Sequence, residues 1–197
     1  MVDYKSIVKY FYELILCELT DIDCWVGGGS ILSFLDKREM YDIDLYFSSE
    51  EERTKCVNYL LKNGGVKVDD NDYTSKFSYN NKSGSKNRNI LLDLIKVYYK
   101  NPTDCMENEI DFSVCAIATD GMEVYKVPNF ESDFLKRRLI FNNIQNTFLN
   151  MIRVVKYTKR GYSISEEELL KLYIIIKHRN FIDTNIRMEW KNYYSYY

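Results

Sequence analysis

Asp42 and Asp44 are two acidic residues in a short segment, residues 42–47, that otherwise has the pattern of a β-strand. Side chains two positions apart in a strand lie on the same face, so the two carboxylates would stand side by side. Unpaired charges on a sheet-forming segment cost free energy unless a cation lies between them. Because magnesium prefers carboxylate oxygens as ligands, this strand is a candidate metal site.

A glycine turn precedes the acidic strand. A short apolar strand at residues 24–26 leads into Gly28, Gly29 and Ser30, and a short apolar helix is predicted over residues 31–35. Glycine lets a ligand approach the backbone closely, and the amide groups at the start of a helix can bind a phosphate. The turn is therefore a candidate phosphate site next to the candidate metal site.

This order of strand, glycine turn, helix and acidic strand resembles the nucleotidyltransferase fold, which polymerase beta-like enzymes and tRNA CCA-adding enzymes share. In that pattern about ten to thirteen residues separate a Gly-Gly/Ser turn from Asp-x-Asp, and here eleven residues separate Ser30 from Asp42. CCA-adding enzymes also carry Arg-Asp shortly after the glycines, where this chain has Leu32 and Ser33. We therefore do not expect a CCA-adding enzyme.

Two later segments extend the resemblance toward small, phage-encoded nucleotidyltransferase-like proteins. Those proteins combine the same beginning with a later strand containing Phe-Asp or Ile-Asp and with a helix that ends in a Lys-Tyr…Arg-Gly-Tyr segment. This chain has Glu-Ile-Asp-Phe at residues 109–112 and a matching basic segment at residues 153–162.

The resemblance implies a third catalytic carboxylate on a later strand, and two aspartates are candidates. Asp93 shares one face of the predicted strand 90–97 with apolar side chains, where a carboxylate needs a partner. Asp111 stands where another predicted strand begins, a place where aspartate commonly serves as a cap or turn residue. We favour Asp93.

The activity implied by the resemblance is two-metal nucleotidyl transfer. Asp42, Asp44 and Asp93 would be the catalytic residues and would bind two Mg²⁺ (or Mn²⁺) ions. The nucleotide phosphates would lie against Gly28, Gly29, Ser30, Arg153 and Lys156. A nucleoside monophosphate would pass from a nucleoside triphosphate to a hydroxyl of an unidentified acceptor, an RNA, a protein or a small molecule, with release of pyrophosphate.

Two other functions stay open at this point. One is a catalytically silent binding or structural protein, viral in origin, that keeps the fold without turnover. The other is a nucleotidyltransferase toxin or second-messenger synthase, because the segments that select an acceptor carry no readable signal. For Arg153 and Lys156 a structural role is a further alternative, since cations near the end of a helix are stabilised by the helix dipole.

Composition and charge limit the partners and the cellular compartment that suit this sequence. The 197 residues carry a formal charge of −2, so any contact with nucleic acid would have to be local. Five cysteines without Cys-x-x-Cys spacing and one histidine favour neither a zinc site nor a disulfide framework. Free thiols suit a reducing compartment. We therefore expect a cytoplasmic protein, in the host cytoplasm if viral, without a signal peptide or membrane span.

The hydrophobic periodicity predicts an α/β fold, with a mixed sheet flanked by helices and then a helical C-terminal region. We place a nucleotidyltransferase-like catalytic domain at residues 1–127 and a helical region, packed on it, at residues 128–197. Helices are predicted at 4–19, 50–62, 101–108, 131–142, 145–159, 166–178 and 184–194, and further strands at 66–68, 73–79, 112–118 and 122–127.

Overall fold

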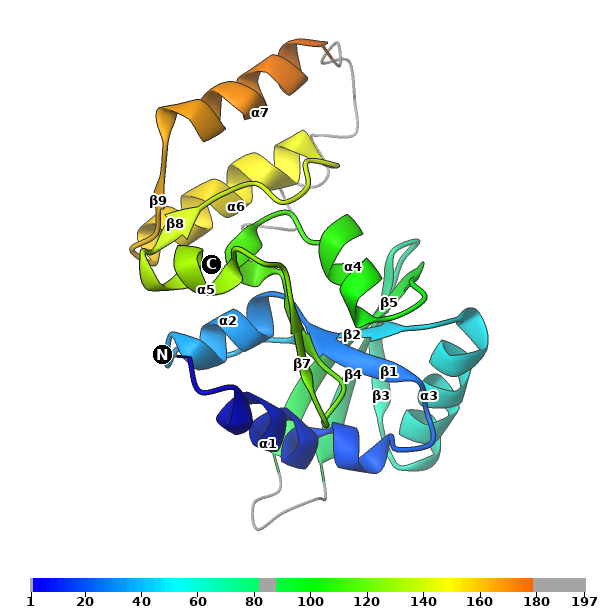
Figure 1. The fold of residues 1–197 in the computed structure, drawn as a ribbon. Coiled ribbons are helices and arrows are strands. Elements are labelled where there is room, and N and C mark those ends of the chain that lie inside the picture. Colours follow the sequence, from blue (N-terminus) through cyan, green and yellow to red (C-terminus); the bar gives the residue numbers. More distant parts are fainter. Residues whose placement is uncertain (1, 82–87, 179–197) are drawn as a thin grey trace.

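The computed structural model describes residues 2–81 and 88–178, so the helix predicted at 184–194 lies outside the described residues. Its centre is a seven-stranded mixed sheet in the order β3-β4-β5-β2-β1-β6-β7 (Figure 1). Among the described strands, β2 and β5 pair in parallel and their neighbours pair antiparallel. The strands are β1 (Cys24–Gly27), β2 (Ile43–Phe47), β3 (Val66–Asp70), β4 (Thr74–Asn81), β5 (Arg88–Tyr98), β6 (Ile117–Thr119) and β7 (Val124–Lys126).

Helices pack around this sheet, as the predicted α/β fold requires. α3 contacts β2 and β5, α1 contacts β6 and β7, and α6 and α7 lie side by side on the side of the sheet away from α1 (Figure 1). A small parallel pair joins β8 (Arg138–Leu139) to β9 (Ser163–Ile164). The helices are α1 (Tyr4–Leu14), α2 (Gly29–Leu35), α3 (Glu50–Lys62), α4 (Pro102–Asn108), α5 (Phe130–Leu135), α6 (Thr147–Lys159) and α7 (Glu166–His178).

Helix α3 forms where the sequence predicts it, because its two ends are encoded locally. Ser49 is the N-cap, and its hydroxyl accepts a hydrogen bond of 3.3 Å from the amide of Glu52. Three glutamates occupy the first turn, where the helix dipole stabilises negative charge. After the helix, Gly64 adopts a φ of +88°, a left-handed conformation that glycine tolerates better than other residues.

The strand predicted at 112–118 and the helix predicted at 131–142 differ in the structure. The apolar run 112–118 is not one strand: residues 113–115 form a 3-10 turn, and β6 begins at Ile117. The turn is held by Ser113, whose hydroxyl donates a buried hydrogen bond of 2.7 Å to Asp133. The helix predicted at 131–142 ends at Leu135, because Arg137 has a φ of +52° that no right-handed helix accommodates.

The predicted N-terminal helix is also shorter, since α1 ends at Leu14 and a 3-10 turn covers Leu16–Glu18. Within the described ranges, no helix is long and apolar enough to cross a membrane.

Neighbouring leucines on α3 test its packing. Leu60 is fully buried, whereas Leu61 is 52% exposed. We expect Leu60→Ala to lower the free energy of unfolding by about 2–5 kcal/mol, because it leaves a cavity. Leu61→Ala should change it by about 0.5 kcal/mol or less. Urea denaturation of both variants measures this difference, and equal losses would show that α3 packs through another face.

Candidate active site

The acidic residues belong to a row of side chains that crosses the sheet. Lys76 on β4 is paired with Asp93 on β5, Asp93 with Asp44 on β2, and Asp44 with Gly27 on β1. Residues paired across neighbouring strands project from the same face. The two carboxylates therefore stand next to each other, with a lysine on one flank and a residue without a side chain on the other.

Asp44 lies half-buried at the centre of this row. Burial is the first cause that raises its pKa, to about 7, and the charges of Asp42 and Asp93 raise it further. The nearby Arg153 and Lys156 act in the opposite direction. In the absence of a bound cation, the site therefore disfavours the charge on Asp44.

Asp93 and Asp42 share one ammonium group. The Nζ atom of Lys76 lies 3.2 Å from Oδ2 of Asp93 and 3.3 Å from Oδ2 of Asp42. The Asp93 side chain is 13% exposed, and its Oδ1 atom is buried without a hydrogen-bond partner. Burial raises the pKa of Asp93 to about 6, although Lys76 opposes the shift. An unpaired buried oxygen beside a second carboxylate is a place that a cation would stabilise.

Asp111 has a different set of partners. Its Oδ2 atom accepts hydrogen bonds of 2.7 Å from Nη1 of Arg153 and 2.9 Å from the side-chain amide of Asn150, both on α6. Asp111 lines the same cavity as Asp93, but its charge is matched by the guanidinium group. The structure thus brings Asp93, rather than Asp111, next to Asp44 and Asp42.

The glycine turn lies beside Asp44. Gly28 has a φ of +78°, and a Cβ atom built there would lie 3.5 Å from Oδ2 of Asp44. The amide of Gly28 donates a hydrogen bond of 3.0 Å to the carbonyl of Ile117, and the hydroxyl of Ser30 donates one of 3.3 Å to the carbonyl of Gly27. Helix α2 begins at Gly29, where the first amides of a helix lack acceptors within it.

These groups meet in one cavity of about 320 Å³ between the sheet and α6. Its floor is acidic and its α6 wall is basic, with Arg153, Lys156 and Arg160 from successive turns of that wall. All eight predicted site residues line it: Gly28, Gly29, Ser30, Asp42, Asp44, Asp93, Arg153 and Lys156.

Two charged residues of this cavity, Arg160 and Glu109, are not among the site residues predicted from the sequence. Arg160 follows Lys156 by four positions, a spacing that places both side chains on one side of a helix and could have identified it. Glu109 accepts a hydrogen bond from the hydroxyl of Tyr99, and burial raises the pKa of its carboxyl. No spacing in the sequence distinguishes Glu109 from other surface glutamates.

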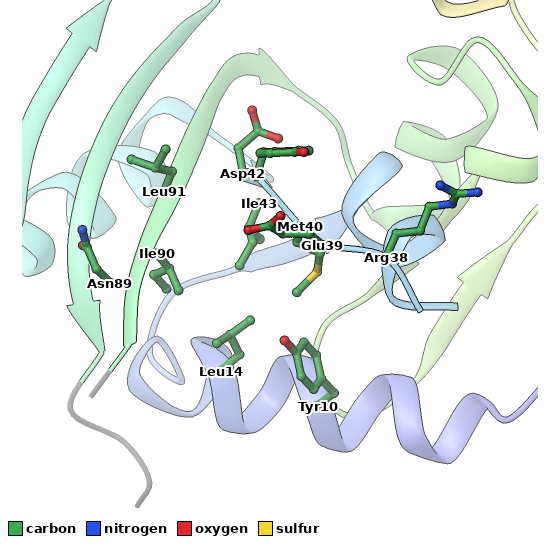
Figure 2. A pocket seen from close by; sticks show the side chains of 11 residues that line it. Tyr10, Leu14, Arg38, Glu39, Met40, Asp42, Ile43, Asn89, Ile90 and Leu91 are labelled. Carbon is green, nitrogen blue, oxygen red and sulfur yellow. The ribbon is translucent and has the colours of Figure 1, made fainter. Parts of the chain in front are cut away.

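A second, more open cavity of about 620 Å³ adjoins the first (Figure 2). Met40, Tyr41 and Asp42 line both cavities, so the segment before β2 forms a shared wall. Tyr10 and Leu14 of α1 form the opposite side of this second cavity, and Ile90 and Leu91 of β5 close one end (Figure 2).

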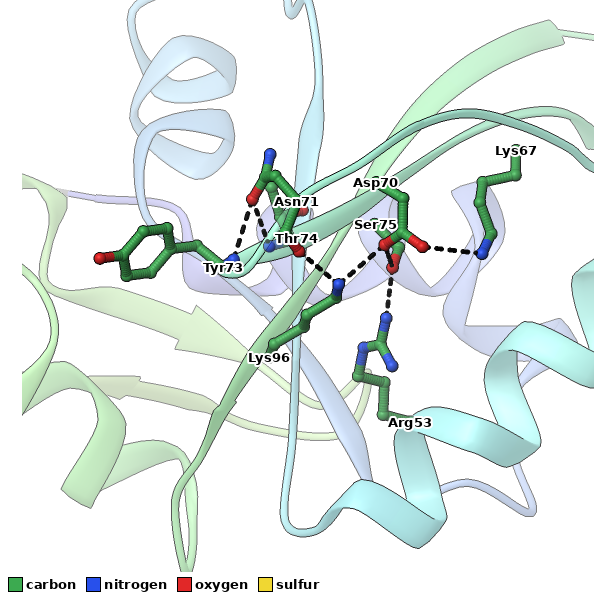
Figure 3. A network of polar contacts seen from close by, with 8 residues as sticks. All are labelled: Arg53, Lys67, Asp70, Asn71, Tyr73, Thr74, Ser75 and Lys96. Carbon is green, nitrogen blue, oxygen red and sulfur yellow. Dashed lines mark hydrogen bonds and ion pairs between the residues drawn. The ribbon is translucent and has the colours of Figure 1, made fainter. Parts of the chain in front are cut away.

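A separate charged network lies at the β3 side of the sheet (Figure 3). The carboxylate of Asp70 pairs with Lys96 at 2.8 Å and with Lys67 at 3.0 Å, and accepts a hydrogen bond of 2.7 Å from Ser75. These three partners, Lys96 first, hold the pKa of Asp70 below its usual range. In contrast to Asp44 and Asp93, this carboxylate is exposed and well compensated.

The carboxylates fit a hard divalent cation by their chemistry, since they offer oxygen atoms and one of these is buried without a partner. Among the described residues, however, no three carboxylate, thiol or imidazole groups lie close enough together to hold a metal ion. Lys76 contacts two of the oxygens that such an ion would bind.

Solved structures share this fold. A CCA-adding enzyme complexed with CTP superimposes with a TM-score of 0.63 and 15% identity, over 96% of this chain and 46% of the other. For the Thermotoga maritima CCA-adding enzyme complexed with tRNA the values are 0.58 and 18%, over 90% and 43%. For the Bacillus stearothermophilus CCA-adding enzyme with CTP they are 0.58 and 15%, over 78% and 40%. At this identity the likeness establishes the nucleotidyltransferase fold.

Sequence comparison leads to a phage protein. The chain is 27% identical to "Gabija anti-defense 2" of Bacillus phage SPbetaL7 over 177 aligned residues, which cover 86% of this chain and 41% of the relative. The chain thus spans less than half the length of the curated relative that it matches. Residues 3–137, more than half of the chain, match the Gabija anti-defense 2 family. The chain therefore belongs to the Gabija anti-defense 2 family.

Proposed function

We propose that this chain is a metal-dependent nucleotidyltransferase that moves a nucleoside monophosphate from a nucleoside triphosphate to an acceptor hydroxyl. A bond forms between the acceptor oxygen and the α-phosphorus, the bond to pyrophosphate breaks, and the hydroxyl proton leaves to water. The observation that carries the proposal is the pair Asp44 and Asp93, two adjacent carboxylates at the floor of a polar cavity with incomplete charge compensation.

Asp42, Asp44 and Asp93 are the residues that would hold Mg²⁺ or Mn²⁺, two ions in the mechanism that the fold suggests. Bound there, the ions would neutralise triphosphate charge and lower the pKa of the acceptor hydroxyl. The protein contributes position: the carboxylates are fixed by the register of two central strands, whereas the acceptor and the nucleotide arrive from solvent.

The phosphates would lie between the start of α2 and the basic wall of α6. Gly29 and Ser30 offer backbone amides, whereas the Gly28 amide already binds a carbonyl, so Gly28 contributes the turn and clearance for Asp44. Lys156 lines the cavity directly. Arg153 pairs with Asp111, and its side chain is 41% exposed, so a phosphate can reach it.

The positions of the candidate site residues support a division of the chain into two regions. Residues 1–127 contain the three candidate metal ligands and the glycine turn, and residues 128–197 contribute the cations of α6. We propose that the first region is the catalytic domain and that the second closes the nucleotide site from one side.

The acceptor would be an RNA, a protein or a small molecule. The fold neighbours were solved with CTP and with tRNA, which favours a nucleoside triphosphate as donor and makes an RNA acceptor a natural first test. The family is described as anti-defense, so we propose that the transfer serves to counteract the Gabija defence in the host cytoplasm.

A second candidate function is a catalytically silent protein that uses the fold for binding. The contact of Lys76 with Asp42 and Asp93 favours it, because an ammonium group already offsets part of the charge that a metal would neutralise. The incomplete compensation of Asp44 and Asp93 favours the active enzyme.

Incubation with each labelled triphosphate, Mg²⁺ or Mn²⁺, and host RNA, protein and small-molecule pools tests the proposal. We expect one pool to acquire label, and Asp44→Asn and Asp93→Asn to reduce labelling by about 100-fold or more. Asp93→Asn should retain triphosphate binding. Asp70→Asn, outside the cavity, should label as the parent does. Undiminished labelling by Asp44→Asn would refute this assignment, and absence of label in every pool would favour the silent protein.

The raised pKa values predict how metal-free protein responds to pH. The pKa of Asp44 is about 7 and that of Asp93 about 6, against 3.8 unfolded, so the folded state keeps protons that the unfolded state loses between about pH 4 and 7. Stability should therefore fall as pH rises through this window. The two shifts correspond to about 7 kcal/mol at full effect, and solvent screening of these partly exposed carboxyl groups reduces the expected fall to on the order of 2–4 kcal/mol.

Calorimetric melting between pH 4 and 8, in chelator, measures this fall. Millimolar Mg²⁺ should restore most of the loss at pH 8, because the cation compensates the ionised carboxylates, and Asp44→Asn should flatten the dependence. A melting temperature that rises with pH in this window, or that ignores Mg²⁺, would contradict the role of these carboxylates.

A further inference from the structure

We infer that Lys76 is a built-in cation that competes with a divalent metal ion for Asp42 and Asp93, so that a metal binds there only when the ammonium group leaves. The inference rests on the proposed function, in which these carboxylates bind metal.

The position of Lys76 is set by the sheet. β4 pairs with β5 in a register that places Lys76 directly beside Asp93. From there its ammonium group reaches Oδ2 of Asp93 at 3.2 Å and Oδ2 of Asp42 at 3.3 Å, with the side chain 21% exposed. Lys76 thus bridges a residue on β5 and a residue just before β2.

A metal and this ammonium group compete for the same oxygens. A magnesium ion binds carboxylate oxygens at about 2.0–2.1 Å, much closer than the ammonium contacts, and its two positive charges repel a lysine nearby. The ammonium group contacts Asp42 and Asp93 with a single positive charge, and Oδ1 of Asp93 stays unpartnered beside it. A divalent ion would therefore compensate the carboxylate charge more fully than the ammonium group does, but it must displace Lys76 in order to bind.

The chain offers a second place for the ammonium group. Lys76 is also paired across the sheet with Asp69 on β3, an exposed residue that flanks Lys76 on the side opposite Asp93. Lysine has a long flexible stem, and a rotation of that stem toward Asp69 would keep the ammonium group near a carboxylate. Displacement of Lys76 from the site therefore does not leave its ammonium group buried without a partner.

Titration with Mn²⁺ alone tests the competition. In isothermal calorimetry we expect Lys76→Met to bind Mn²⁺ at least about tenfold more tightly than the parent, because the variant removes the competing charge and keeps the stem. Lys76→Arg, which keeps the charge, should bind within about threefold of the parent. The matched control is Lys96→Met, which removes an ammonium group that pairs with Asp70 outside the cavity and should leave Mn²⁺ affinity unchanged.

Thermal melting gives a second readout. In chelator Lys76→Met should melt below the parent, and Mn²⁺ should raise its melting temperature by more than it raises that of the parent. If Lys76→Met does not fold without metal, Lys76→Gln takes its place, because a neutral amide can still donate a hydrogen bond to one carboxylate.

The outcomes separate the inference from the proposed function. Equal Mn²⁺ affinity in the parent and in Lys76→Met, or weaker affinity in the variant, would overturn the inference and leave metal binding intact. Absence of Mn²⁺ binding in the parent and in every Lys76 variant would instead remove the metal-dependent function, and the inference with it.

Discussion

The row Lys76–Asp93–Asp44–Gly27 is the constraint on which the site depends. Strand pairing fixes a lysine, two aspartates and a glycine at one level of the sheet, and it places the two carboxylates next to each other with one ammonium group beside them. Two neighbouring carboxylates repel each other when both are charged. This repulsion decreases when one of them is protonated, when Lys76 pairs with it or when a metal ion binds. On the opposite wall of the cavity, Arg153 and Lys156 supply positive charge above this row.

The two sides of the cavity come from distant parts of the chain, which explains how a nearly neutral protein can present a charged site. The acidic floor comes from β5, β2 and the segment before β2. The basic wall comes from Arg153 and Lys156 on α6 and from Arg160, the residue that caps its C-terminus. Asp111 connects the two by its hydrogen bond to Arg153, so it positions the wall rather than completing the floor. A triphosphate and divalent ions have the charges that would fit between these surfaces.

The sequence predicted the parts of the site that depend on local order. The α/β fold, the glycine turn and the acidic strand follow from spacing, and Asp93 stands out as a candidate because a lone charge in an apolar strand needs a partner. The contact of Lys76 could not be predicted, since it depends on the register of β4 against β5. The broken strand at 112–118 could not be predicted either, because its cause is a tertiary hydrogen bond between Ser113 and Asp133.

We propose that Asp42, Asp44 and Asp93 bind a divalent metal together with a nucleoside triphosphate. The most direct measurement is anomalous diffraction from crystals of the protein grown with Mn²⁺ and a non-hydrolysable triphosphate. We expect an anomalous peak within coordination distance of Asp42 and Asp44, with the phosphates between α2 and α6 and with the Lys76 ammonium group moved away from Asp93. A cavity that holds no anomalous peak at saturating Mn²⁺, with Lys76 still between Asp42 and Asp93, would contradict it.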